Sequence, residues 1–132
     1  MLQKAQVYQS TVRHGDQIGS RFVYPTINLD PLVLPQTLKR GVYASLVTIA
    51  GRTYAGALYF GPRVVKKEKY DVLEIYLLNF TAGSNEFELY DQSVEFSLKK
   101  FIRGVLDFAH LADLREQISK DILLVKEALN EK

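Results

Sequence analysis

The segment DVLEIYLLNF, residues 71–80, is the part of the chain from which the fold follows most directly. Side chains alternate between two faces along a β-strand, so Leu73, Ile75 and Leu77 share one face, which we expect to lie in a core. The opposite face carries one acid, Glu74, among apolar neighbours. The segment therefore predicts a strand with a lone carboxylate in its middle.

Similar short runs, rich in β-branched and aromatic residues and separated by turn signals, occur on both sides of this segment. The runs 41–50 and 53–60 flank the glycine-containing turn GRT and are typical of a β-hairpin. Further strands are expected at 5–12 and at 92–101. These runs predict a small β-sandwich or β-barrel.

Only the C-terminal segment, residues 110–132, changes to a helical period. Its apolar residues recur three or four positions apart, which predicts a one-sided stripe on a helix of about five turns. Leu123 and Leu124 are expected to widen this stripe. A helix that follows a set of strands is predicted to pack against the barrel or sandwich. The stripe consists of Leu111, Leu114, Ile118, Ile122, Val125 and Leu129.

Composition describes an ordinary globular chain, which we expect to form one domain over residues 1–132. The net charge of +2 is far from the dense basic stripe of a nucleic-acid binder, so no nucleic-acid partner is expected. The chain has no cysteine, which excludes disulfides, thiol chemistry and cysteine-based metal sites. It shows no signal-peptide run and no membrane-length apolar segment, so we expect a soluble, cytoplasmic, monomeric protein without a membrane partner.

Two polar features near the N-terminus have a functional and a structural interpretation. The loop HGDQIGSR places Gly15 and Gly19 four residues apart, which suits a backbone nest for phosphate or simply a flexible loop. In PTIN, Thr26 and Asn28 alternate in an extended segment and point to the same side, whereas Ile27 points to the other. Their two neutral oxygens could hold a hard cation beside phosphate, or satisfy backbone groups at a proline bend.

Two charged residues further along have the same ambiguity. Glu74 could act as a general base, or it could be a solvated acid paired with Lys66, Lys67 or Lys69. Arg103, expected just after the strand 92–101, could contact a planar ligand or lie at the surface.

Taken in order, these stretches resemble the riboflavin kinase (flavokinase) family. The matching segments include STVRHGDQIGSRFVYPTINL, GVYASLV, YAGALYFGPR, LEIYLL, ELYDQSVEF and IRGVLDFAHLADLREQISKDI. No single motif is distinctive, but the ordered set covers nearly the whole chain.

The resemblance implies a six-stranded Greek-key β-barrel with a C-terminal α-helix packed against it. It also implies an enzyme that transfers the γ-phosphate of ATP to the ribityl 5′-hydroxyl of riboflavin, giving FMN and ADP with Mg²⁺ or another divalent cation. In that role Thr26 and Asn28 would bind the metal and the nucleotide phosphates, and Glu74 would be the catalytic base. Gly15 and Gly19 would cover the nucleotide. Arg103 and Phe108 would lie beside the flavin.

The sequence departs from the family pattern at several positions around these residues. Val23 replaces the glycine before the PTxN motif, and Tyr76 replaces the histidine two residues after the strand glutamate. The family's Asn-Ile-Gly is Tyr59-Phe60-Gly61 here, and Val105 stands where the family has an acid. The metal and base residues are retained, which indicates a divergent kinase. The alternative is a non-catalytic flavin- or nucleotide-binding module on the same barrel.

Overall fold

The structure is a computed structural model that describes residues 6–13, 25–62, 70–79, 89–106 and 110–130. Strands dominate this part up to residue 106, and one long C-terminal helix follows them. The strands are β1 (Val7–Thr11), β2 (Thr26–Leu29), β3 (Gly41–Ile49), β4 (Arg52–Pro62), β5 (Asp71–Leu77) and β6 (Ser93–Gly104); a short 3-10 helix, η2 (Pro31–Val33), follows β2, and α1 (Leu111–Asn130) ends the described chain.

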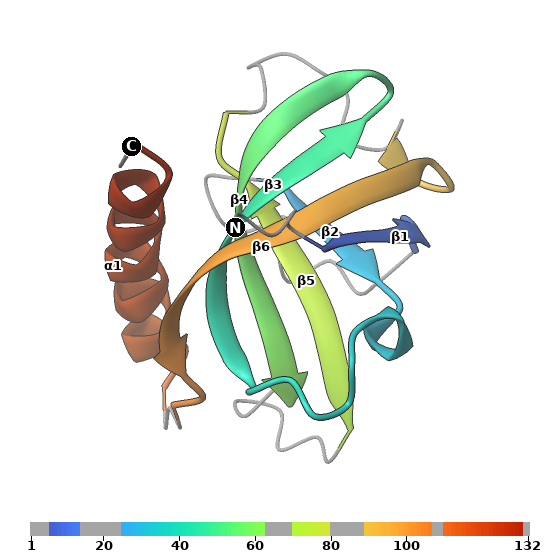
Figure 1. Cartoon of the computed structure of the whole chain (residues 1–132). Coiled ribbons are helices and arrows are strands. Elements are labelled where there is room, and N and C mark those ends of the chain that lie inside the picture. Colours follow the sequence, from blue (N-terminus) through green and yellow to red (C-terminus); the bar gives the residue numbers. More distant parts are fainter. Residues whose placement is uncertain (1–5, 14–24, 63–69, 80–88, 107–109, 131–132) are drawn as a thin grey trace, which may run out of the picture.

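The strands form a single six-stranded sheet in the order β1-β6-β3-β4-β5-β2, and every neighbouring pair is antiparallel. Strands β3, β4 and β5 form a meander, and β6 returns to lie beside β3, which is the Greek-key arrangement. The sheet curls, so the two edge strands approach each other, as Figure 1 shows. The chain just after β1 meets β2 at a bridge, where the Arg13 amide donates to the Asn28 carbonyl at 2.7 Å. The predicted Greek-key barrel with a C-terminal helix is confirmed.

The predicted hairpin is the β3–β4 pair, which closes in a two-residue turn. Ile49 pairs with Arg52, and the intervening Ala50 and Gly51 both have positive φ angles, of 50° and 79°. Positive φ at both central residues matches the right-handed twist of the flanking strands. Glycine at the second position adopts this backbone without strain.

The interior of the curled sheet is the main hydrophobic core. The alternation in β5 is confirmed, because Leu73, Ile75 and Leu77 are each at most 1% exposed. They pack with inward-facing residues of the five remaining strands, among them Ile27, Phe60 and Phe96. The faces of the strands are thereby fixed: side chains that alternate with these core residues lie on the outer face of the barrel.

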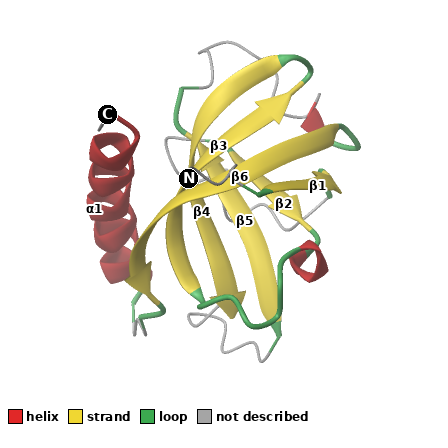
Figure 2. Ribbon diagram, viewed as in Figure 1, coloured by secondary structure: helices red, strands yellow, loops and turns green. Residues whose placement is uncertain are grey.

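Helix α1 covers part of that outer face, as Figure 2 shows with the helix standing beside the sheet. Its Ile122 and Val125 pack on Tyr76 and on two small side chains, Ala44 and Ala57, which let the helix approach closely. Leu123 and Leu124 are 63% and 46% exposed, so the expectation that they widen the buried stripe is wrong. They follow Ile122 directly and are rotated away from the sheet, since each residue advances about 100° around a helix.

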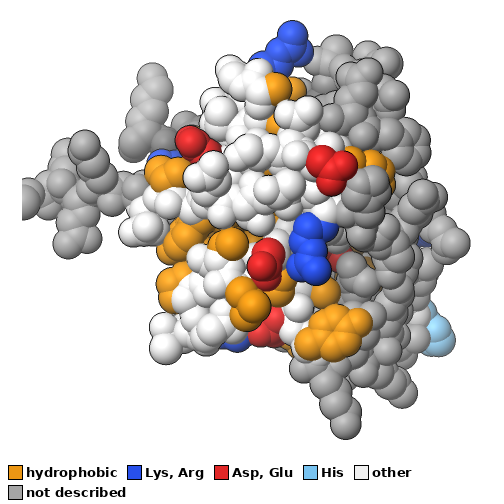
Figure 3. Space-filling model, turned by 90° about the vertical axis from the view of Figure 1, so that its right-hand side faces the viewer, with side chains coloured by type: hydrophobic (Ala, Val, Ile, Leu, Met, Phe, Trp, Pro, Cys, Tyr) orange, Lys and Arg blue, Asp and Glu red, His pale blue; other side chains and the backbone are white. Residues whose placement is uncertain are grey.

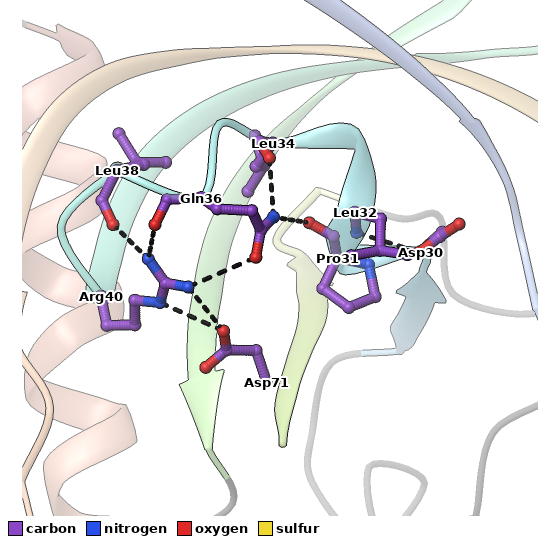
Figure 4. Close-up of polar contacts among 8 residues, drawn as sticks. All are labelled: Asp30, Pro31, Leu32, Leu34, Gln36, Leu38, Arg40 and Asp71. Atoms are coloured by element: carbon purple, nitrogen blue, oxygen red, sulfur yellow. Dashed lines mark hydrogen bonds and ion pairs between the residues drawn. The ribbon is translucent and has the colours of Figure 1, made fainter.

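The connection between η2 and β3 is fastened to the start of β5 by Arg40 (Figure 4). Its guanidinium donates to Asp71 at 2.7 Å and to the carbonyls of Gln36 and Leu38 at 2.6 and 2.8 Å. The same group lies over the Phe60 ring, 4.4 Å from its centroid. This clamp holds β5, and with it Glu74, in register with the rest of the barrel.

Figure 3 looks onto the side of the molecule that lies to the right in Figure 1, where β1, β2 and η2 lie. The described acidic and basic side chains on this face are interspersed, with hydrophobic side chains between them. Within the described ranges, no helix has the length and apolar character needed to cross a membrane.

Candidate active site

The PTIN segment is a strand rather than a bend. Thr26 to Leu29 form β2, which pairs with β5. Ile27 and Leu29 are 2% exposed and face the core, so Thr26 and Asn28 share the outer face, as their spacing predicts. The strand stops at Asp30, whose carboxylate accepts a hydrogen bond from the Leu32 amide at 2.9 Å and caps η2.

The strand register brings polar residues from distant parts of the sequence into one row on the outer face. Asn28 of β2 lies opposite Glu74 of β5, and Glu74 lies opposite Tyr59 of β4. Tyr59 is opposite Val42 of β3, which is in turn opposite Arg103 of β6. Residues directly opposite each other in antiparallel strands point to the same face and are side-chain neighbours. Three residues that the sequence suggested separately, Asn28, Glu74 and Arg103, therefore belong to one row.

Thr26 lies in the next row, opposite Tyr76 of β5. Its Oγ1 atom is buried and makes no hydrogen bond of ordinary geometry with the described residues. A buried hydroxyl without a full partner is costly to the fold. Its position beside Asn28 fits a cation together with phosphate oxygens, since both side chains offer neutral oxygen atoms.

Two tyrosines flank Glu74, and both have raised pKa values. Burial raises the pKa of Tyr59 to about 12; the positive charge of Arg103 opposes this shift, and the negative charges of Glu74 and Asp71 add to it. Burial likewise raises the pKa of Tyr76, Glu74 adds to the shift, a contact with the Thr26 hydroxyl opposes it, and Asp121 adds slightly. Both phenols therefore hold their protons to a higher pH than an ordinary tyrosine does.

Tyr59 also fixes the end of β4. Its hydroxyl donates to the Pro62 carbonyl, and its ring lies against Gly61. These contacts fix the orientation of Tyr59 next to Glu74 in the row.

Arg103 lies within β6 rather than just after a strand, because β6 continues to Gly104. Its backbone pairs with Val42, and Gly104 pairs with Gly41. The side chain of Arg103 is 15% exposed and forms an ion pair with Asp121 of α1. A surface arginine, one of the two sequence interpretations, is therefore not what the structure contains.

Several predicted site residues fall outside the described ranges. These are the two glycines of the early loop and the aromatic residue expected beside the flavin, and also the three lysines considered as partners of Glu74. They are Gly15, Gly19, Phe108, Lys66, Lys67 and Lys69. The described site thus contains Thr26, Asn28, Glu74 and Arg103.

Sequence reasoning missed two residues of this region. The sequence marks Tyr59 only as the replacement of a family asparagine, and the β4–β5 register is what places it beside Glu74. Asp121 did carry a signal, since it lies three residues after Ile118 and four before Val125, on the predicted apolar face of the helix. An acid at such a position needs a partner.

The family model described as Flavokinase: Riboflavin kinase matches residues 2–129 of the chain. The chain belongs to the flavokinase family. A bifunctional riboflavin kinase/FMN adenylyltransferase from Buchnera aphidicola subsp. Schizaphis graminum is 35% identical to this flavokinase chain over 122 residues, which are 90% of this chain and 37% of the relative. The RNA-binding riboflavin kinase RibR of Bacillus subtilis is 31% identical over 120 residues, which are 90% of this chain and 49% of the relative. The chain therefore spans between about a third and a half of the length of these relatives.

Solved structures share the fold of this chain. The riboflavin kinase of Trypanosoma brucei superposes with a TM-score of 0.66 at 20% identity, covering 95% of this chain and 77% of that one. A macrolide-efflux protein from Streptococcus pneumoniae superposes with a TM-score of 0.74 at 23% identity, covering 97% of this chain and 40% of that one. At these identities the likeness concerns the fold alone.

Proposed function

We propose that this chain transfers the γ-phosphate of ATP to the 5′-hydroxyl of the ribityl chain of riboflavin, yielding FMN and ADP. The observation that carries the proposal is the cross-strand row that joins Asn28, Glu74 and Arg103, with Thr26 beside it. The family resemblance assigns these residues to the phosphates, the base and the flavin, and they share one face of one sheet. Membership of the flavokinase family supports the same reaction.

In this proposal, Glu74 accepts the proton of the ribityl 5′-hydroxyl. The oxygen of that hydroxyl bonds to the γ-phosphorus, and the bond between the γ-phosphorus and the ADP oxygen breaks. Phosphoryl transfer depends mainly on positioning and charge neutralisation, and the base contributes a smaller factor. Tyr59 and Tyr76 are neutral near neutral pH, as tyrosines normally are, and bring no further negative charge close to the incoming phosphates.

Thr26 and Asn28 are the residues that would hold a divalent cation together with the nucleotide phosphates. When bound, Mg²⁺ would neutralise charge that develops on the phosphate oxygens. The buried Thr26 hydroxyl and the neighbouring Asn28 amide oxygen suit this ion, because magnesium prefers oxygen ligands and keeps few protein ligands beside phosphate.

The proposal is tested by incubating the purified chain with riboflavin, Mg²⁺ and ATP, and separating the flavins by chromatography. FMN should appear in a 1:1 ratio with ADP. If the chain binds riboflavin but makes no FMN with ATP, GTP, CTP or UTP, the kinase proposal is wrong and the chain is a flavin-binding module. If it neither binds nor phosphorylates riboflavin, both functions are wrong.

A further inference from the structure

One buried ion pair connects the end of β6 with the middle of α1. The Arg103 Nε and Nη2 atoms donate to the two carboxylate oxygens of Asp121 at 2.8 and 2.7 Å. The side chains are 15% and 4% exposed. A two-point contact of this kind fixes the plane of the guanidinium as well as its position.

The neighbours of this pair restrict it further. Gln117, one helical turn before Asp121, donates to Asp121 Oδ1 at 3.0 Å, and Arg103 Nη1 donates to the Gly104 carbonyl at 2.9 Å. Contacts with the described residues thus use three of the five N–H groups of Arg103. The remaining two, and the flat face of the guanidinium, are what it can offer to a ligand.

Arg103 also lies at one end of the row that contains Glu74. In the register of the sheet, Tyr59 and Val42 lie between Glu74 and Arg103, and both charged groups act on the pKa of Tyr59. A rotation of the guanidinium would therefore change the surface that a ligand meets next to Glu74.

From these contacts we infer that Asp121 is a positioning residue for flavin binding: it orients Arg103 toward the flavin, and α1 thereby forms part of the site. This inference rests on the proposed function. The competing explanation is that the ion pair only fastens α1 to the barrel. Any effect of Asp121 on flavin binding would then be independent of Arg103.

A double-mutant cycle separates these explanations. The dissociation constant for riboflavin is measured by fluorescence titration for the wild type, Asp121→Asn, Arg103→Gln and the double variant. We expect each single change to weaken binding on the order of tenfold, as misplacement of a ligand-contacting group does. The double variant should bind no more weakly than Arg103→Gln, because Asp121 then has no guanidinium left to orient. The KM for ATP should stay within about twofold of the wild type, since Asp121 is not placed at the phosphates.

Two further variants complete the experiment. Glu116→Gln is the matched control, because Glu116 is on the same helix and its 4.0 Å pair with Lys120 is exposed, at 71% and 64%. It should bind riboflavin as the wild type does. Gln117→Met removes only the amide that donates to Asp121 and keeps the charges of Arg103 and Asp121. We therefore expect it to fold even if Asp121→Asn does not. It should weaken flavin binding about threefold.

The outcomes distinguish this inference from the proposed function. Wild-type flavin affinity in both Asp121→Asn and Gln117→Met overturns the positioning role and leaves the kinase proposal intact. The positioning role is also overturned if Asp121→Asn weakens flavin binding by the same factor in the wild type and in Arg103→Gln, because that result indicates a purely structural effect. Failure of the wild-type chain to bind riboflavin overturns both.

Discussion

Thr26 carries a hydroxyl group at a place where the fold itself has little use for one. Its oxygen is buried and lacks a hydrogen bond of ordinary geometry among the described residues. A methyl group in its place would avoid the cost of burying that oxygen. The hydroxyl is understandable if a ligand completes it.

Thr26→Val should therefore separate stability from function. The free energy of unfolding should rise by about 1 kcal/mol, because an unsatisfied buried hydroxyl is removed at nearly constant volume. The Mg²⁺ concentration for half-maximal FMN formation should rise at least about tenfold, because one oxygen ligand is lost. Urea denaturation and a magnesium titration measure the two effects. Thr53→Val, on the exposed part of β4, is the control, and an unchanged magnesium dependence in Thr26→Val would remove Thr26 from the metal site.

Ionisation of Tyr59 should make the folding stability of the chain depend on pH in the alkaline range. Burial raises its pKa from 10.0 to about 12, so the folded chain holds the phenol proton more tightly than the unfolded chain does. The resulting stabilisation is complete below pH 10 and is lost as the pH rises from 10 to 12. The loss is on the order of 1 kcal/mol, less than the full shift implies, because solvent screens a half-buried group.

Tyr59→Phe tests this dependence, since phenylalanine cannot ionise. The free energy of unfolding of the variant should fall less steeply than that of the wild type between pH 10 and 12, with the remaining slope coming in part from Tyr76. Chemical denaturation at several pH values provides the measurement, with Tyr70→Phe, whose side chain is 65% exposed in the wild type, as the control. Identical slopes for wild type and Tyr59→Phe would contradict the buried position of this phenol.

At the level of elements, the contact between the start of β3 and the end of β6 controls where Arg103 stands. Gly41 has φ = +152°, and a Cβ atom built on it would lie 2.0 Å from the Arg103 carbonyl oxygen. Only glycine allows β3 to begin so close to the β6 backbone. The glycine of the GVYA motif thus has a local structural reason.

Gly41→Ala should destabilise the chain by at least about 2 kcal/mol, because the added methyl group meets backbone atoms that cannot move aside independently. It should also reduce flavin affinity, because the β6 backbone at Arg103 must shift. Gly104→Ala is the control one strand away, where an added Cβ meets nothing within 4 Å. Equal thermal stability of the two variants would show that the close approach of β3 and β6 is not as described.

Helix α1 offers a second test at this scale. Val125 is fully buried against the sheet, whereas Leu123 is 63% exposed. Val125→Ala should lower the free energy of unfolding by about 2 kcal/mol through lost burial and a small cavity. Leu123→Ala should change it by less than about 0.5 kcal/mol. Similar losses in both variants, measured by urea denaturation, would restore the wider apolar stripe that the sequence predicted.

These elements also show what the sequence could reveal. Alternation in β5 identifies its core face correctly, because one side of every strand in a small barrel must be buried. The period of the C-terminal segment identifies a helix, but it assigns Leu123 and Leu124 to the wrong side, because leucine type alone says nothing about the direction in which a residue points. Strand ends are harder to predict from sequence. β6 extends to Gly104 because Gly41 and Val42 pair with its end, and these partners are far apart in the chain.

Over the whole molecule, the site depends on the order of the strands in the sheet. Asn28, Glu74, Tyr59 and Arg103 come from four strands, and only the β2-β5-β4-β3-β6 order brings them into one row. Local chemistry alone favours a structural role for Thr26 and Asn28 and leaves the two roles of Glu74 evenly balanced. The family resemblance assigned them roles, and the register supplies the neighbourhood that such roles require. Tyr59 could not have been found without that register, because nothing in its local sequence refers to β5.

The central claim is that this outer-face row performs phosphoryl transfer with Glu74 as the base. It is tested most directly by the single-turnover rate of FMN formation for the wild type, Glu74→Gln and Glu95→Gln, an exposed acid of β6 that serves as the control. At saturating riboflavin, ATP and Mg²⁺, Glu74→Gln should be slower by at least about a hundredfold, the usual contribution of a general base, while Glu95→Gln keeps the wild-type rate. FMN formation by Glu74→Gln at the wild-type rate would contradict the account.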